Sequence, residues 1–122
     1  MPRRSRQALE AAVAAAAGPA ARAQACYDLA LFHDNNSREA EAIPLYREAL
    51  RLGLPTPVAA EARAWLASSL MKTGGPDDAM RHAGEARRRT SDAALLAFLD
   101  GLDRRIRRRM GLAAGLSRGA RT

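Results

Sequence analysis

The sequence predicts an all-α protein built as a short α-solenoid, a row of stacked antiparallel helix pairs. Alanine, the strongest helix former, supplies much of the apolar content, and only 4% of the 122 residues are aromatic. Glycine and proline lie mostly between the alanine-rich segments, which argues against a β-sheet. A ladder of small residues with one aromatic also recurs thirty-seven residues downstream, which predicts two copies of one unit. Its members are Ala30, Ala42, Tyr46 and Ala49, then Ala67, Ala79, Ala83 and Ala86.

The N-terminal segment predicts a helix that precedes the repeated units. This helix is expected over residues 5–17, because Gly18 and Pro19 stop it. Residues 1–19 are therefore interpreted as an N-terminal capping helix. Small and apolar residues at three- and four-residue intervals then predict a helix over residues 20–35, the first member of the first pair.

The second helix of the first pair is expected to begin after Ser37 and to end at Gly53. Ser37 is its expected N-cap, because a serine side chain there accepts hydrogen bonds from free backbone N–H groups. Pro44 lies inside this helix and removes the hydrogen bond to the Ala40 carbonyl. We expect a kink at this point.

The second unit repeats the plan with helices over residues 58–72 and 76–89, joined by a glycine-containing turn. Thr90 or Ser91 is the expected cap of a last helix, which Gly111 ends. Residues 20–110 thus form the helical repeat domain, and residues 111–122 form a flexible tail. One side of the last helix carries Leu95, Leu99, Leu102 and Ile106.

The repeated unit resembles the tetratricopeptide repeat over about residues 20–100. The first copy matches the pattern of that family at Leu29, Ala30, Ala42, Tyr46 and Ala49, and the second at Leu66, Ala67, Gly74, Ala79 and Ala86. Residues 38–50, with their internal proline, are especially similar to a small bacterial subfamily. The resemblance implies a non-catalytic adaptor or scaffold that binds a protein or peptide. Arg63, Leu70 and Ala83 depart from the pattern.

The resemblance also implies a concave groove lined mainly by the first helix of each pair. Members that bind acidic chaperone tails carry a clamp of Lys, Asn and Arg in this groove, whereas this chain has Tyr27, Leu31, Ala64 and Ser68 at those positions. Asp34 and Glu61 instead favour a peptide with some basic character, and the alternative is that these polar residues are merely solvated. The candidate partner-groove residues are Gln24, Tyr27, Leu31, Asp34, Asn35, Glu61, Ser68, Met71 and Lys72.

The charge distribution supports an alternative function, association with a polyanion. The net charge is +7, and residues 81–122 carry all of the excess. Clustered cations release counterions from RNA, DNA or an anionic membrane surface. Against this, Asp100 and Asp103 lie four residues before Arg104 and Arg107, and aromatic stacking residues are lacking nearby. The candidate polyanion patch is Arg104, Arg105, Arg107, Arg108 and Arg109.

No residue cluster predicts catalysis, a metal site or a cofactor. Cys26 and His33 lie seven residues apart on one expected helix, about 10 Å along its axis, whereas a nucleophile and its base lie roughly 3 Å apart. His82 lies on another helix, and no paired Cys or His has metal-ligand spacing. We therefore expect no enzyme.

Composition favours a cytoplasmic protein. The single cysteine excludes an intramolecular disulfide, and no apolar run approaches the roughly 20 residues that cross a bilayer. The basic N-terminus before residues 11–17 faintly resembles a signal peptide, but Glu10 interrupts it. Because about three repeats are usually needed for stability, two and a half units also make self-association a prediction.

Overall fold

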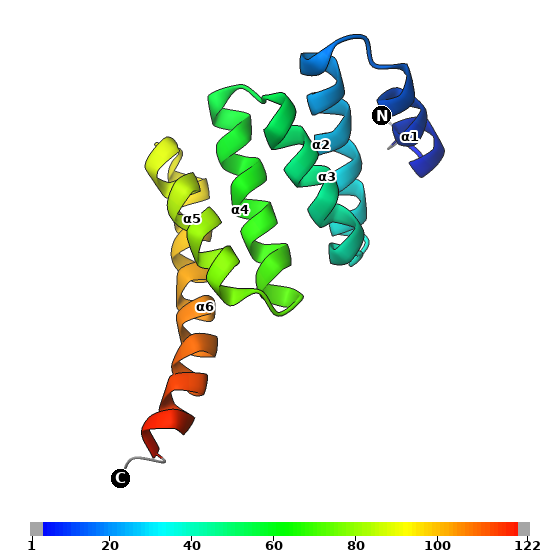
Figure 1. Ribbon diagram of the computed structural model, residues 1–122. Coiled ribbons are helices and arrows are strands. Elements are labelled where there is room, and N and C mark those ends of the chain that lie inside the picture. Colours follow the sequence, from blue (N-terminus) through cyan, green and yellow to red (C-terminus); the bar gives the residue numbers. More distant parts are fainter. Residues whose placement is uncertain (1–3, 120–122) are drawn as a thin grey trace.

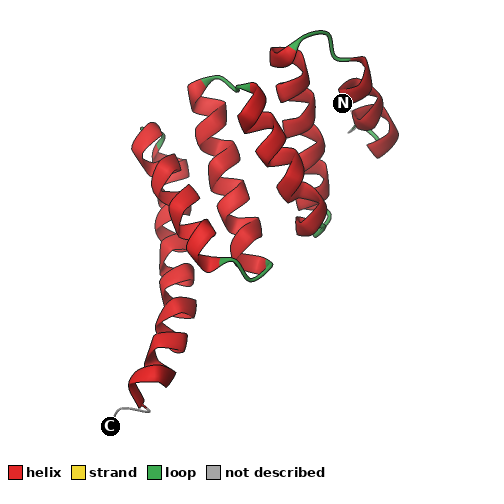
Figure 2. Cartoon of the chain, in the orientation of Figure 1, coloured by secondary structure: helices red, strands yellow, loops and turns green. Residues whose placement is uncertain are grey.

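Six helices follow one another along residues 4–119, the part of the chain that the computed structural model describes. Side chains are described for residues 4–111. Consecutive helices run antiparallel with short loops between them, and the helix pairs follow one another along the molecule (Figures 1 and 2). This arrangement confirms the all-α solenoid. The helices are α1 (Arg6–Ala15), α2 (Pro19–Asn35), α3 (Glu39–Leu52), α4 (Thr56–Lys72), α5 (Pro76–Arg89) and α6 (Ala93–Gly119).

The core is built mainly from alanines and leucines, together with the buried tyrosines Tyr27 and Tyr46. Tyr46 is fully buried between the helices, and Ala30, Ala42 and Ala49 beside it have no exposed surface. Methyl-sized side chains at these positions allow the backbones of α2 and α3 to approach closely. The same holds for α4 and α5, where the repeated ladder residues Ala67, Ala79, Ala83 and Ala86 are buried.

The turn after α2 corrects the expectation for Ser37. This residue adopts a left-handed backbone conformation with φ of 60°, so it lies past the end of α2 rather than capping α3. Its N–H donates to the Asp34 carbonyl at 3.1 Å, and the Arg38 N–H donates to the His33 carbonyl at 2.8 Å. These two bonds satisfy the last carbonyls of α2, a Schellman motif. Arg38 becomes the N-cap of α3, although its side chain makes no capping hydrogen bond to this helix.

The turn after α4 has the same geometry in the same register. Gly74 adopts φ of 94°, and its N–H donates to the Met71 carbonyl at 3.3 Å. The Gly75 N–H donates to the Leu70 carbonyl at 2.8 Å. Ser37 and Gly74 therefore occupy equivalent positions, although glycine is the residue that accepts this conformation without strain.

Two boundaries of the helices differ from those expected from sequence. Helix α4 begins at Thr56, because Pro57 lies in the first turn, where no intrahelical N–H is required. Neither Thr90 nor Ser91 caps α6. Asp92 does, since its carboxylate accepts a hydrogen bond from the Leu95 N–H at 2.8 Å.

The end of the chain corrects a further expectation. Helix α6 does not end at Gly111 but continues to Gly119. A single glycine weakens a helix by only about 1 kcal/mol, which favourable neighbours offset. The C-terminal part of α6 extends beyond the other helices (Figure 1). Residues 120–122 of the expected tail lie outside the described part of the chain.

Pro44 and Arg63 are the two unfavourable residues of the pairs. Helix α3 continues through Pro44, which is exposed, as is Ala40, so the Ala40 carbonyl that lost its donor lies in an exposed part of the helix. Arg63 stands where the repeat pattern places an aromatic residue. Its Nε is buried without a hydrogen-bond partner among the described residues, and burial lowers the pKa of its guanidinium.

Candidate binding groove

A groove crosses the first helices of successive pairs, α2 and α4, and reaches α6. These three helices lie parallel, so that one face of each contributes to the same hollow, which has a volume of about 490 Å³. The structure brings seven of the nine expected groove residues together there and adds two aromatic residues. The groove is lined by Tyr27, Leu31, Asp34, Asn35, Glu61, Trp65, Ser68, Lys72 and Phe98.

A chain of hydrogen bonds holds the floor of the groove between α2 and α4. The Trp65 indole N–H donates to the Tyr27 hydroxyl at 3.1 Å, and this hydroxyl donates to the Glu61 carboxylate, also at 3.1 Å. Burial, followed by the charge of Glu61, raises the pKa of Tyr27, so the phenol stays protonated and remains a donor. The indole and the phenol are therefore held in place before any partner arrives.

Two aromatic rings form the apolar part of the groove. The Trp65 and Phe98 rings meet edge to face with centroids 4.7 Å apart and an interplanar angle of 69°. Both side chains are only half-buried, so a partner that covers them removes further apolar surface from water. Exposed aromatic rings of this kind are typical anchors of protein interfaces.

The sequence interpretation missed both rings, although spacing alone identifies one of them. Trp65 lies four residues after Glu61 and three before Ser68, on the same helical face. Phe98 was missed because the last helix was interpreted only through its buried leucine side. The last helix was already interpreted as the first half of a third unit, but its groove face was not followed to Phe98.

Two expected groove residues lie elsewhere. Gln24 faces the hollow between α1 and α2, and its amide donates to the Asp28 carboxylate at 2.9 Å. Met71 lies on the other side of Lys72, in a second hollow. The groove is therefore shorter on α2 and longer toward α6 than the sequence predicts.

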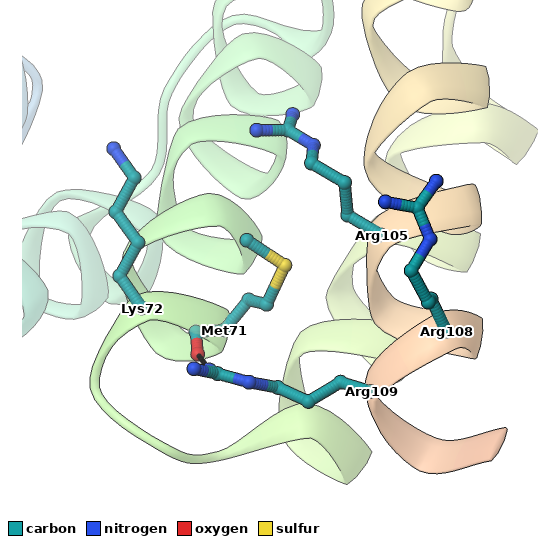
Figure 3. A pocket seen from close by; sticks show the side chains of 5 residues that line it. All are labelled: Met71, Lys72, Arg105, Arg108 and Arg109. Carbon is teal, nitrogen blue, oxygen red and sulfur yellow. Dashed lines mark hydrogen bonds between the residues drawn. The ribbon is translucent and has the colours of Figure 1, made fainter. Parts of the chain in front are cut away.

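This second hollow, the cationic pocket, has a volume of about 380 Å³ and lies between the end of α4 and the middle of α6 (Figure 3). Lys72 and Arg105 flank Met71, and Arg109 donates a hydrogen bond to the Met71 carbonyl. The latter contact ties α6 to the C-terminal end of α4. The cationic pocket is lined by Met71, Lys72, Arg105, Arg108 and Arg109.

Three of the five arginines of the candidate polyanion patch therefore line a pocket, and two do not. Arg104 and Arg107 are exposed on other faces of α6. Asp100 and Asp103, which lie four residues before them in sequence, instead pair with Arg87 of α5, at 2.7 and 2.9 Å. The five arginines of the patch make no ion pair with a carboxylate in the described part of the chain.

The residues considered above as a nucleophile, a base or metal ligands lie apart from one another in the structure. Cys26 is buried, and burial raises the pKa of its thiol, which disfavours the reactive thiolate. His33 is buried in the last turn of the same helix, seven residues further along, and His82 lies on α5. Among residues 4–119 no three His, Cys, Asp or Glu side chains come together as a metal-binding group.

The fold and groove define a short helical-repeat solenoid, a class in which stacked units present a concave surface to a partner. The chain belongs to the tetratrico peptide repeat family, whose family model matches residues 23–102. This membership suggests a role in protein interaction. Neither the curated proteins nor the solved structures gave a match. Within residues 4–119, every helix is too short or too polar to cross a membrane.

Proposed function

We propose that this protein is a non-catalytic adaptor or scaffold that binds a segment of a protein partner in the groove across α2, α4 and α6. The observation that carries the proposal is the edge-to-face pair of Trp65 and Phe98, both half-buried, in which a hydrogen-bond chain holds the Trp65 indole. Because the indole is already held in place, covering it with a partner costs little further conformational entropy of this side chain. Membership of the repeat family supports the same role.

The first prediction is that truncation of one groove ring weakens binding. Random-sequence peptides displayed on phage are selected on the full chain, and the affinities of the enriched peptides are measured by fluorescence anisotropy. Phe98→Ala is expected to weaken them about tenfold or more, as expected for an aromatic anchor. Leu96→Ala is the matched control, because Leu96 is also half-buried on α6 but does not line the groove.

Equal affinities for the two variants, or no enrichment over an unrelated protein, would contradict the groove proposal. Circular dichroism melting of both variants shows that each remains folded. Affinity capture from cells followed by mass spectrometry then identifies natural partners. Capture that is lost in Phe98→Ala and kept in Leu96→Ala assigns them to the groove.

One observation favours a second candidate function, association with a polyanion through α6. Arg104 and Arg107 are exposed. Neither pairs with Asp100 or Asp103, because both carboxylates pair with Arg87. Binding to nonspecific nucleic acid should then weaken steeply with salt, since released counterions drive it. Charge reversal at either pair of arginines, Arg104 with Arg107 or Arg105 with Arg108, should weaken it to a similar extent. No retention on a heparin column at moderate salt excludes this function.

A further inference from the structure

The groove and the cationic pocket are two parts of one continuous surface. Lys72 lines both. On α6, Phe98 lines the groove and Arg105 lines the cationic pocket, and the two residues are seven positions apart on one helical face. This spacing is two turns, about 10 Å along the axis. An extended segment of a few residues therefore spans from the ring of Phe98 to the guanidinium of Arg105.

The acidic and basic side chains along this surface differ in the hydrogen bonds that they already make within the chain. Asp34 accepts a hydrogen bond from Tyr46, and Glu61 accepts one from Tyr27. By contrast, Arg108 has no hydrogen-bond or ion-pair partner among the described residues, and Arg105 donates only to a carbonyl of its own helix, at 3.4 Å. The cationic end of the surface therefore has the free hydrogen-bond donors.

The cationic pocket combines these donors with an apolar floor. Met71 is buried between Lys72 and Arg105 (Figure 3). Lys72 is half exposed and lies 3.8 Å from the carboxylate of Glu39, whose side chain is 20% exposed. Long cationic side chains around an apolar floor suit a ligand that carries carboxylates beside apolar atoms. A phosphate backbone that followed the groove would instead meet the carboxylates of Asp34 and Glu61, which repel it.

We infer that the partner of the groove is an acidic protein segment with an apolar or aromatic anchor. The anchor side chain lies against Trp65 and Phe98, and the neighbouring Asp or Glu side chains lie in the cationic pocket, where Arg105, Arg108 and Lys72 donate to them. This inference rests on the proposed function of the groove. It adds the chemistry of the partner, and it places the partner's acidic residues at the end of the surface formed by the cationic pocket.

The test uses the phage-selected peptides described above and two double variants with the same change of charge. Arg105→Glu/Arg108→Glu reverses two charges of the cationic pocket. Arg104→Glu/Arg107→Glu reverses two charges on the same helix outside it, and is the matched control. Arg105→Gln/Arg108→Gln is a milder variant that keeps the test valid if the reversed chain unfolds. Arg109 is left unchanged because it also ties α6 to α4.

Peptides selected on the wild-type chain are expected to be enriched in Asp and Glu beside an apolar residue. Their affinity should fall about tenfold or more in Arg105→Glu/Arg108→Glu, fall less in the glutamine variant, and stay within a few-fold in the control pair. Selected peptides without acidic enrichment, or equal losses in the two reversed variants, would overturn the inference while the groove proposal stands. Loss of nonspecific RNA binding together with unchanged peptide affinity would overturn it in favour of a nucleic acid. Failure of the Phe98→Ala test removes the groove itself.

Discussion

At the scale of single residues, Tyr46 connects the two helices of the first pair. Its ring is fully buried among alanines, and its hydroxyl donates to the Asp34 carboxylate of α2 at 2.7 Å. The ring also lies 6.1 Å from that of Tyr27, centroid to centroid. Burial, followed by the hydrogen bond to Asp34, raises the pKa of Tyr46, so the hydroxyl stays a donor. One residue thus fills the core and supports the groove.

The two contributions of Tyr46 are separable by substitution. Tyr46→Phe is expected to lower the free energy of unfolding by about 1 kcal/mol, because only the hydrogen bond is lost. Tyr46→Ala should lower it by about 3–5 kcal/mol, because a cavity forms at the centre of the pair. Urea denaturation followed by circular dichroism measures both values. Equal losses in the two variants would show that the hydrogen bond, not the ring, dominates.

His33 makes the stability depend on pH. Its side chain is buried at the end of α2, and burial is the main cause that lowers its pKa below the ordinary value of 6.5. Glu41 raises this pKa, whereas Arg38 lowers it and donates to the ring Nδ1 at 3.0 Å. The pKa of His82 is lowered too, by burial first and by Arg63 second. Both folded-state histidines therefore favour the neutral form.

Because the unfolded chain binds these protons more readily, the free energy of unfolding should be at its full value above about pH 6.5 and fall as the pH drops below it. His33→Gln/His82→Gln is expected to flatten this dependence between about pH 7 and pH 5. Thermal melts across that range test it. A wild-type chain whose stability rises on acidification would contradict the assignment.

At the scale of elements, the turns that end α2 and α4 share one backbone geometry with different residues. Ser37 has the left-handed conformation that Gly74 adopts at the equivalent position. An L-residue in this conformation is strained, because its Cβ approaches the backbone carbonyl. The first turn is therefore the weaker of two equivalent turns.

Ser37→Gly should raise the free energy of unfolding by about 1 kcal/mol, because it removes this strain. Gly74→Ser is the reciprocal change and should lower the free energy by a similar amount. A Cβ added at Gly74 meets no atom within 4 Å, so the change in stability reports mainly the strain of the left-handed backbone. Chemical denaturation of both variants provides the measurement. Destabilisation by Ser37→Gly would show that the serine side chain has a stabilising role.

At the scale of the whole molecule, each helix packs mainly on its neighbours in sequence. Each helix pair is therefore stabilised mainly by the helices next to it. The C-terminal end depends on the buried side of α6, where Leu99, Leu102 and Ile106 have no exposed surface. The N-terminal end depends on α1, in which Leu9 is the buried residue.

A cavity at one end of the row should therefore loosen that end first. Leu99→Ala is expected to lower stability by about 2–5 kcal/mol and to reduce hydrogen-exchange protection in α5 and α6 more than in α2. Leu9→Ala, the control at the opposite end, should reduce protection in α1 with little effect on α5. Protection lost uniformly in both variants would show a single cooperative unit.

Much of the fold was predictable from local rules. Small residues at fixed spacing predicted the helix pairs, and Pro76, Gly53 and the turn before α5 marked boundaries that the structure reproduces. The errors lie at Ser37, the start of α4, the cap of α6 and Gly111. At each of these points, backbone geometry or neighbouring packing outweighed the local preference of one residue type. The expected kink at Pro44 stays a prediction.

The groove was predictable only in part, for a similar reason. The family resemblance placed Tyr27 and Leu31 in one groove with Glu61, but it did not show that Phe98 of α6 would meet Trp65 of α4. It also could not show that Asp100 and Asp103 would pair with Arg87 of another helix. Contacts between helices depend on their relative placement, which the local pattern of one helix does not contain.

By itself, the sequence determined that this chain forms stacked helix pairs, because propensity, spacing and breaker residues act within a few positions of one another. It also determined where the positive charge is concentrated. Only the tertiary structure decided which side chains share a surface: it joined an aromatic groove to a cationic pocket through Lys72. The physical reason is that side chains about 30 positions apart become neighbours only when three parallel helices stack, and their combined chemistry exists only then.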